Sequence, residues 1–81
     1  MNELADTIVS IGERQTAKDF LKNILTPTEL DGVVKRLQIV KLLKKGVPQR
    51  EIAKKLNVSI GTITRGSREL KYGVPGFKKI I

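Results

Sequence analysis

The chain has 81 residues, enough for one small domain that would bury only roughly 60% of its unfolded surface if it stood alone. It contains no cysteine and no apolar run near the roughly 18 residues of a membrane span, so we expect no disulfide and no membrane segment, and a cytoplasmic protein. Its net charge of +8 is uneven: residues 1–34 carry three bases and six acids, and residues 35–81 carry thirteen bases and two acids, which favours a polyanionic partner for the second half.

Two short helices are predicted in the first third of the chain. The first spans about Asn2 to Ile11, where apolar residues recur at helical spacing before a glycine. The second spans about Ala17 to Ile24, with Thr16 in the N-cap position that hydroxyl side chains favour.

A longer helix is predicted to follow. Residues Thr26–Glu29 form a capping box with proline in the first helical position, and the helix should run to Lys44 or Lys45 and end at Gly46. Its apolar residues form two stripes, one of Leu30, Val33, Val34, Leu37 and Val40, and the other of Ile39, Leu42 and Leu43. Since a surface helix needs one apolar stripe, two stripes predict that this helix packs against its own domain on one side and against a partner subunit on the other.

The segment from Gln49 to Leu70 has the pattern of a helix-turn-helix. A helix over Gln49–Leu56 is followed by Asn57, which tolerates left-handed backbone, and by Ser59 as the N-cap of a helix over Ile60–Lys71. The inward positions are apolar: Ile52, Leu56, Val58, Ile63 and Leu70. This pattern predicts a DNA-binding segment whose second helix enters the major groove.

The outward positions of the second helix are small, hydroxylated or basic, as a groove-facing surface should be: Ile60, Gly61, Thr62, Thr64, Arg65 and Arg68. Ile60 either contacts a thymine methyl group or belongs to the core. We expect Arg50 and Thr64 to contact bases, and Lys44, Lys45 and Lys54 to contact phosphates. Gln49 and Ser59 complete the predicted DNA-binding set.

The tail predicts a turn followed by a last helical turn. Tyr72–Gly76 is rich in turn residues, and Phe77, Ile80 and Ile81 should pack against the core. Because no strand pattern occurs, we predict an all-α single domain over residues 1–81. Residues 1–46 and 72–81 would form the dimerisation core, and residues 47–71 the helix-turn-helix.

The stretch from Leu25 to Lys71 resembles the bacterial tryptophan repressor family. The matching pieces are LTPTE at 25–29, KRLQIV at 35–40, QREIA at 49–53 and SIGTITRGSREL at 59–70, of which ITRGS at 63–67 is the most specific. The resemblance implies an intertwined helical homodimer that binds a palindromic double-stranded DNA operator. It also implies L-tryptophan as a corepressor, with no prosthetic group.

Carried over by position, the resemblance implies a ligand site between core and helix-turn-helix. Arg36 and Arg65 would sandwich the indole, and Arg65 would pair with the ligand carboxylate. Thr26 and the backbone around Leu25 would close the site from the other subunit. Glu69 departs from the family, which has a small hydroxyl residue there. Its carboxylate either pairs with the ligand ammonium group or binds Arg65 one turn earlier.

Three interpretations remain open from the sequence. The first is a tryptophan-controlled repressor, the second a ligand-independent DNA-binding regulator, and the third an accessory DNA-binding segment of a larger complex. We expect no enzyme and no metal site, because histidine and cysteine are absent and no carboxylate pair has a catalytic spacing.

Overall fold

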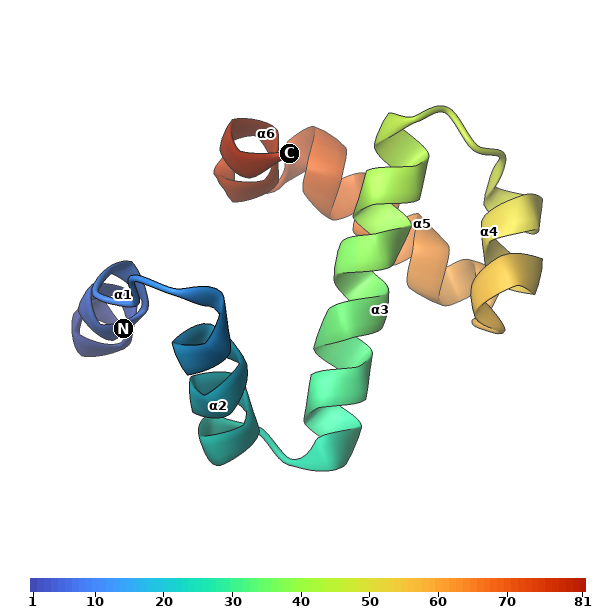
Figure 1. Cartoon of the computed structure of the whole chain (residues 1–81). Helices are drawn as coiled ribbons and strands as arrows, with labels where there is room; N and C mark the ends of the chain where they lie inside the picture. The colour runs from blue at the N-terminus through green and yellow to red at the C-terminus, as the bar shows by residue number, and fades with distance from the viewer. The chain divides into compact units, whose positions relative to one another are not determined.

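The computed structural model describes all of residues 1–81 and contains six α-helices and no strand (Figure 1). The helices are α1 (Asn2–Val9), α2 (Arg14–Ile24), α3 (Pro27–Lys44), α4 (Gln49–Leu56), α5 (Ile60–Tyr72) and α6 (Gly76–Ile80). The predicted all-α class is therefore confirmed. The chain divides into two compact units, Met1–Asp31 and Gly32–Ile81, which are described separately. No helix is both long and apolar enough to cross a membrane.

The first unit departs from the predicted helix bounds. Helix α1 ends at Val9 instead of Ile11, and Ser10 is its C-cap, where the Ser10 hydroxyl donates to the Thr7 carbonyl at 2.6 Å. Helix α2 begins at Arg14 instead of Ala17, so Thr16 lies inside the helix and is not its N-cap. The cap residue is Glu13, whose carboxylate accepts a 2.9 Å hydrogen bond from the Thr16 hydroxyl and so supports the extra turn.

The predicted capping box opens α3. The Thr26 backbone N–H donates to the Glu29 carboxylate at 2.9 Å, and the Glu29 backbone N–H donates to the Thr26 hydroxyl at 3.2 Å. The backbone hydrogen bond from Thr26, followed by the one to its side chain, holds the pKa of Glu29 below its ordinary value of 4.5. These reciprocal bonds satisfy donors that a helix start otherwise leaves unpaired.

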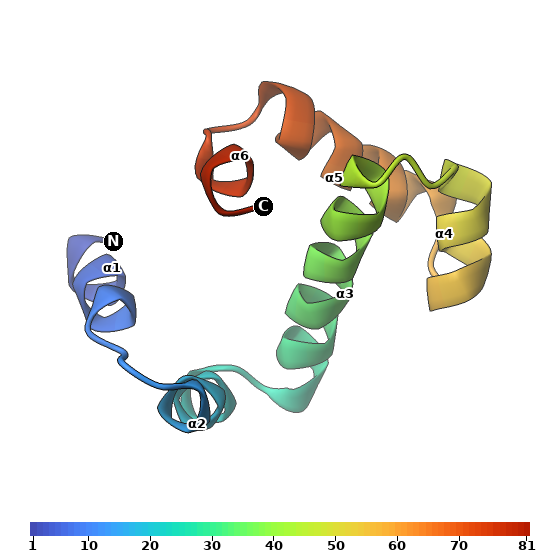
Figure 2. The same cartoon turned by 45° about the horizontal axis from the view of Figure 1, so that its top comes forward.

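The second unit is built on a small apolar core where three helices meet. Ile39 of α3, Ile52 of α4 and Ile63 of α5 are buried together. Six half-buried apolar side chains pack around them: Leu42, Leu43, Val47, Ala53, Leu56 and Val58. Figures 1 and 2 show α5 crossing the carboxyl-terminal half of α3. At this crossing a Cβ on Gly66 would lie 3.1 Å from the Ile39 Cγ2 methyl group, so glycine permits the close approach.

In this unit, the backbone preferences and side-chain hydrogen bonds of single residues explain where helices end and begin. Gly46 has φ of +84° after the end of α3, a conformation that glycine adopts without strain. Asn57 has φ of 54° and ψ of 50° at the end of α4, as its tolerance of left-handed backbone predicts. Ser59 caps α5, accepting a 3.2 Å hydrogen bond from the Thr62 backbone N–H. These three breaks set the direction of α4 and α5 against α3.

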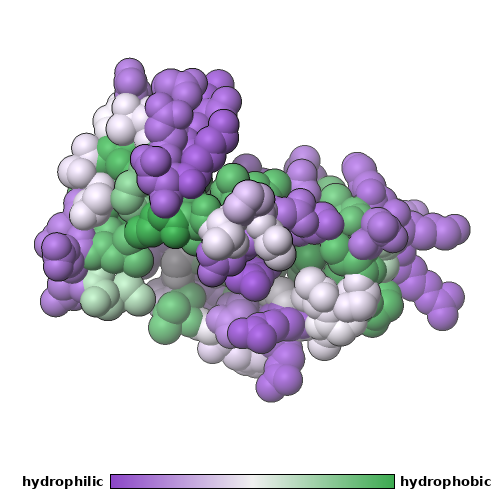
Figure 3. All heavy atoms as spheres, turned by 90° about the horizontal axis from the view of Figure 1, so that it is seen from below, coloured by the Kyte–Doolittle hydropathy of each residue, from purple (hydrophilic) through white to green (hydrophobic).

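Much apolar surface stays exposed in the single chain (Figure 3). Only four side chains are fully buried, namely Ile39, Val40, Ile52 and Ile63. In the second unit, Val33, Val34 and Leu37 of α3 are each about 40% exposed. Phe77 is half-buried, but Ile80 is 85% exposed, so the expectation that Ile80 packs against the core is wrong for the single chain. The half-buried apolar residues here are Phe77 of α6 and Ile81, which directly follows the helix.

Candidate nucleic-acid interface and ligand cavity

The second unit carries most of the positive charge at its surface. Of its charged residues, thirteen are basic and two are acidic. The predicted phosphate contacts Lys44, Lys45 and Lys54 are exposed, as is Arg50, while Gln49 is half-buried. Arg50 and Lys54 line an open hollow between α4 and the start of α5, together with Ile60. This surface therefore has the cationic groups that duplex phosphates attract.

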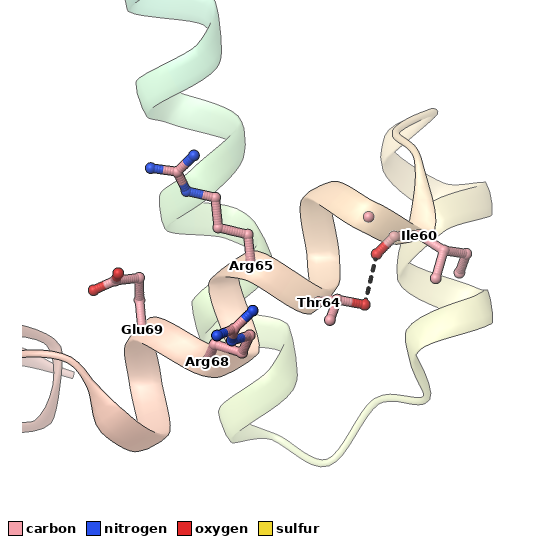
Figure 4. Close-up of a pocket in the computed structure, with 6 residues that line it drawn as sticks. Ile60, Thr64, Arg65, Arg68 and Glu69 are labelled. Atoms are coloured by element: carbon pink, nitrogen blue, oxygen red, sulfur yellow. Dashed lines mark hydrogen bonds between the residues drawn. The ribbon is translucent and has the colours of Figure 1, made fainter.

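A second open hollow follows the outward face of α5, and we call it the outer hollow. It is lined by Ile60, Gly61, Thr64, Arg65, Arg68 and Glu69 (Figure 4). Ile60 is 47% exposed and belongs to no buried cluster, so it is available for an apolar contact in a DNA groove. The Thr64 hydroxyl donates to the Ile60 carbonyl at 3.0 Å, which leaves the Thr64 oxygen as an acceptor for a base amino group.

A cavity lies on the inward side of α5, and we call it the inner cavity. It has a volume of about 280 Å³ and is formed by α3, α5 and α6. Its lining residues are Arg36, Ile39, Val40, Thr62, Arg65, Gly66, Glu69 and Phe77. The inner cavity therefore combines an apolar wall with two guanidinium groups and one carboxylate, and its size approaches the range of roughly 300–1,000 Å³ typical of small-molecule sites.

Thr62, which we expected on the DNA-facing side, lines the inner cavity. Its hydroxyl lies 2.8 Å from the Ser59 hydroxyl, and its backbone N–H donates to the same Ser59 oxygen. Thr62 thus joins the cap of α5 to the wall of the inner cavity. Any group bound in the cavity would rest against the residue that holds the beginning of α5.

The two pairs of residues that the resemblance assigns to the ligand lie in different units. Arg36 and Arg65 meet at the inner cavity, from α3 and α5. Leu25 and Thr26 lie in the first unit, at the junction of α2 and α3, where Thr26 belongs to the capping box. Sequence reasoning missed Gly66 and Phe77 as cavity residues. The sequence offered one signal for each of them. Gly66 lies in the specific ITRGS segment, and Phe77 is the one aromatic residue after Tyr72.

The comparisons with known proteins all indicate one family. The family described as Trp repressor protein matches residues 1–81. The Trp operon repressor homolog of Actinobacillus succinogenes is 47% identical over 77 residues, which cover 94% of this chain and 76% of that protein. That of Mannheimia succiniciproducens is 54% identical over 61 residues, covering 74% of this chain and 60% of that protein. A crystal structure of a candidate Trp repressor from Staphylococcus aureus is similar with a TM-score of 0.90 and 29% identity, covering 98% of this chain and 79% of that one.

Proposed function

Since the chain belongs to the Trp repressor family of DNA-binding transcription regulators, we propose that it represses transcription as a homodimer on a palindromic operator, under the control of L-tryptophan. This assigns the protein to transcription regulation and not to catalysis, and to the cytoplasm, where bacterial chromosomal DNA lies.

One observation supports the proposal above the others. The outer hollow and the inner cavity are neighbours on the surface of helix α5, and Arg65 and Glu69 line both. A ligand held between α3 and α5 would therefore act directly on the helix that faces DNA. Ligand binding can favour DNA binding only if the ligand prefers the orientation of α5 that fits the groove.

We assign the DNA contacts to the exposed residues of the α4 and α5 surface. Arg50, Ile60, Gly61, Thr64 and Arg68 would face the groove, and Lys44, Lys45 and Lys54 the phosphates. Arg36 and Arg65 would hold the aromatic ring and carboxylate of the ligand, because a planar guanidinium stacks on rings and pairs bidentately with carboxylates.

The test measures affinity for DNA with and without L-tryptophan. Duplexes that bind the protein are first selected from random sequence, and their affinity is then measured at constant salt concentration. We expect saturating L-tryptophan to tighten binding by about 5–150-fold, the range typical of allosteric coupling. Arg65→Ala should abolish this increase, whereas Arg14→Ala in α2 removes an exposed arginine elsewhere and should preserve it.

Two results would contradict parts of the proposal. Tight, sequence-selective DNA binding that L-tryptophan leaves unchanged would show a ligand-independent regulator. Equal affinity for selected and random duplexes would remove sequence-specific repression altogether.

A further inference from the structure

The turn between α4 and α5 consists of Asn57, Val58 and Ser59, and each residue has a different environment. Val58 packs against the apolar core of the second unit. The Ser59 hydroxyl caps α5 by accepting a hydrogen bond from the Thr62 backbone N–H. Asn57 is exposed, and its side-chain amide has no hydrogen-bond partner in the chain. The amide of Asn57 is therefore the polar side-chain group of this turn that the fold itself does not use.

The backbone of Asn57 explains the turn without its side chain. Its left-handed conformation ends α4, and its backbone N–H donates to the Ala53 carbonyl. Glycine adopts left-handed backbone without the strain of a side chain, so a glycine at this position would make the same turn. The amide can therefore serve in binding another molecule.

Asn57 lies in the open hollow between α4 and the start of α5, which we call the α4 hollow. The residues that line it are Arg50, Glu51, Ala53, Lys54, Asn57 and Ile60. Lys54 and Asn57 both come from the carboxyl-terminal end of α4, whereas Glu51, the one acid of the hollow, lies in its first turn. One end of the α4 hollow thus offers an ammonium group and a neutral amide donor side by side in the sequence, a combination that suits a phosphate group.

We propose that Asn57 is a further DNA-contacting residue, whose side-chain amide donates a hydrogen bond to a phosphate oxygen beside Lys54. The inference rests on the proposed function, in which α5 enters the major groove and the preceding helix crosses the DNA backbone. Asparagine amides are common donors to phosphate oxygens in protein–DNA complexes. Because Asn57 precedes Ile60, the first residue of α5, we assign it to the phosphates at the edge of the groove and not to the bases.

The variant Asn57→Gly tests this role, because it removes the amide and keeps the left-handed turn. Its affinity should fall on selected and random duplexes alike, by about 2–10-fold for each copy of the chain on the duplex, the effect of one hydrogen bond. The slope of log affinity against log salt should stay at the wild-type value, because a neutral amide releases no counterion. Lys54→Ala, which removes a charge from the same hollow, should instead lower this slope.

Two further variants control for the change in chemistry. Asn57→Asp also tolerates left-handed backbone, but its carboxylate would face a phosphate, so it should weaken binding more than Asn57→Gly. Asn2→Gly makes the matched substitution at an exposed asparagine of α1, in the first unit, and should keep the wild-type affinity. Circular dichroism and thermal melts establish that all variants are folded at the temperature of the titrations.

The outcomes separate this inference from the proposed function. If Asn57→Gly is folded and binds DNA as tightly as the wild type, Asn57 acts only through its backbone and the inference is overturned. A loss confined to the selected duplex would also overturn it, since Asn57 would then contact a base. If the wild-type protein binds selected and random duplexes equally, sequence-specific repression fails while a uniform loss for Asn57→Gly still supports the phosphate contact. If the wild-type protein binds neither duplex, both are overturned.

Discussion

The two glycines of α5 differ in how much space a side chain would have at their positions. A Cβ on Gly61 would meet only the Ser59 hydroxyl oxygen, at an ordinary contact distance of 3.8 Å. A Cβ on Gly66 would lie 3.1 Å from the Ile39 Cγ2 methyl group, and Ile39 is only 1% exposed. Gly61 therefore has room for a side chain, and Gly66 faces a core that cannot easily move away.

We predict that Gly61→Ala raises the free energy of unfolding by up to ~1 kcal/mol, because alanine loses less backbone entropy in a helix. Gly66→Ala should instead lower the free energy of unfolding by ~1–3 kcal/mol, because overpacking of the core outweighs the gain in backbone entropy. Urea denaturation followed by circular dichroism measures both. A stabilised Gly66→Ala variant would show that the crossing of α3 and α5 is looser than described.

The cations of the α4 surface should differ in what they contribute to DNA binding. Arg50→Ala is expected to cost about 1–3 kcal/mol on a selected duplex and less on random DNA, because a base contact distinguishes sequences. Lys54→Ala should weaken binding to both duplexes equally and lower the slope of log affinity against log salt by about one. Titrations at several salt concentrations test this. If Arg50→Ala lowers the affinity for selected and random duplexes equally, Arg50 contacts phosphates and not bases.

Helix α3 belongs to both units, and its two ends are held by different means. Its beginning depends on the local capping box of Thr26 and Glu29. Its carboxyl-terminal half contributes Ile39 to the core of the second unit, where α5 crosses it. The beginning should thus respond to changes in the cap, and the end to changes in the core.

The pKa of Glu29 predicts an acid-sensitive beginning of α3. Because its pKa in the folded protein lies below its ordinary value of 4.5, Glu29 stabilises the fold above that pH. The contribution is lost as the pH falls through the lower folded pKa. Urea unfolding at pH 7 and pH 3 should show a smaller acid-induced loss of stability for Glu29→Gln than for the wild type. Glu3→Gln, an exposed acid of α1, should keep the wild-type loss.

Removing the other half of the cap should act at all pH values. Thr26→Ala deletes the hydroxyl that accepts the Glu29 backbone N–H and should cost ~1 kcal/mol at neutral pH. The melting temperature measures this loss. An unchanged melting temperature would mean that water or another group replaces the hydroxyl at no cost.

At the scale of the whole molecule, the single chain leaves too much apolar surface uncovered for its size. Four buried side chains make a small core, and thirteen large apolar side chains are more than a third exposed. Val33, Val34 and Leu37 are the exposed members of one of the two apolar stripes of α3, and the sequence predicts a partner subunit for one of these stripes. A second copy of the chain is the occupant that we propose for this surface.

We therefore predict a melting temperature that rises with protein concentration and a solution mass of twice the 9.0 kDa of the chain. Leu37→Lys should place a charge in the interface and give monomers or unfolded chains. Gln38→Lys adds the same charge at the next position of α3 and should leave the dimer intact. Light scattering and thermal melts at several concentrations test this. A well-folded wild-type monomer at micromolar concentration would refute the dimer.

The sequence by itself determined the features that depend on neighbouring residues. The capping box of α3, the glycine turn at Gly46, the left-handed Asn57 and the cap at Ser59 were all predicted, as were the bounds of α4. Each rests on hydrogen bonds or backbone preferences within about four residues. Prediction failed at Thr16, where a competing local partner, Glu13, allowed α2 to start earlier.

The tertiary structure decided which residues share the inner cavity. The resemblance suggested Arg36 and Arg65, but Phe77 and Gly66 joined them only once α3, α5 and α6 were packed together. Thr62, which the sequence places on the DNA side, is exposed and also lines this cavity. Residues far apart in the chain meet through the angles at which helices cross. Those angles depend on contacts such as Gly66 with Ile39, which no periodicity within one helix encodes.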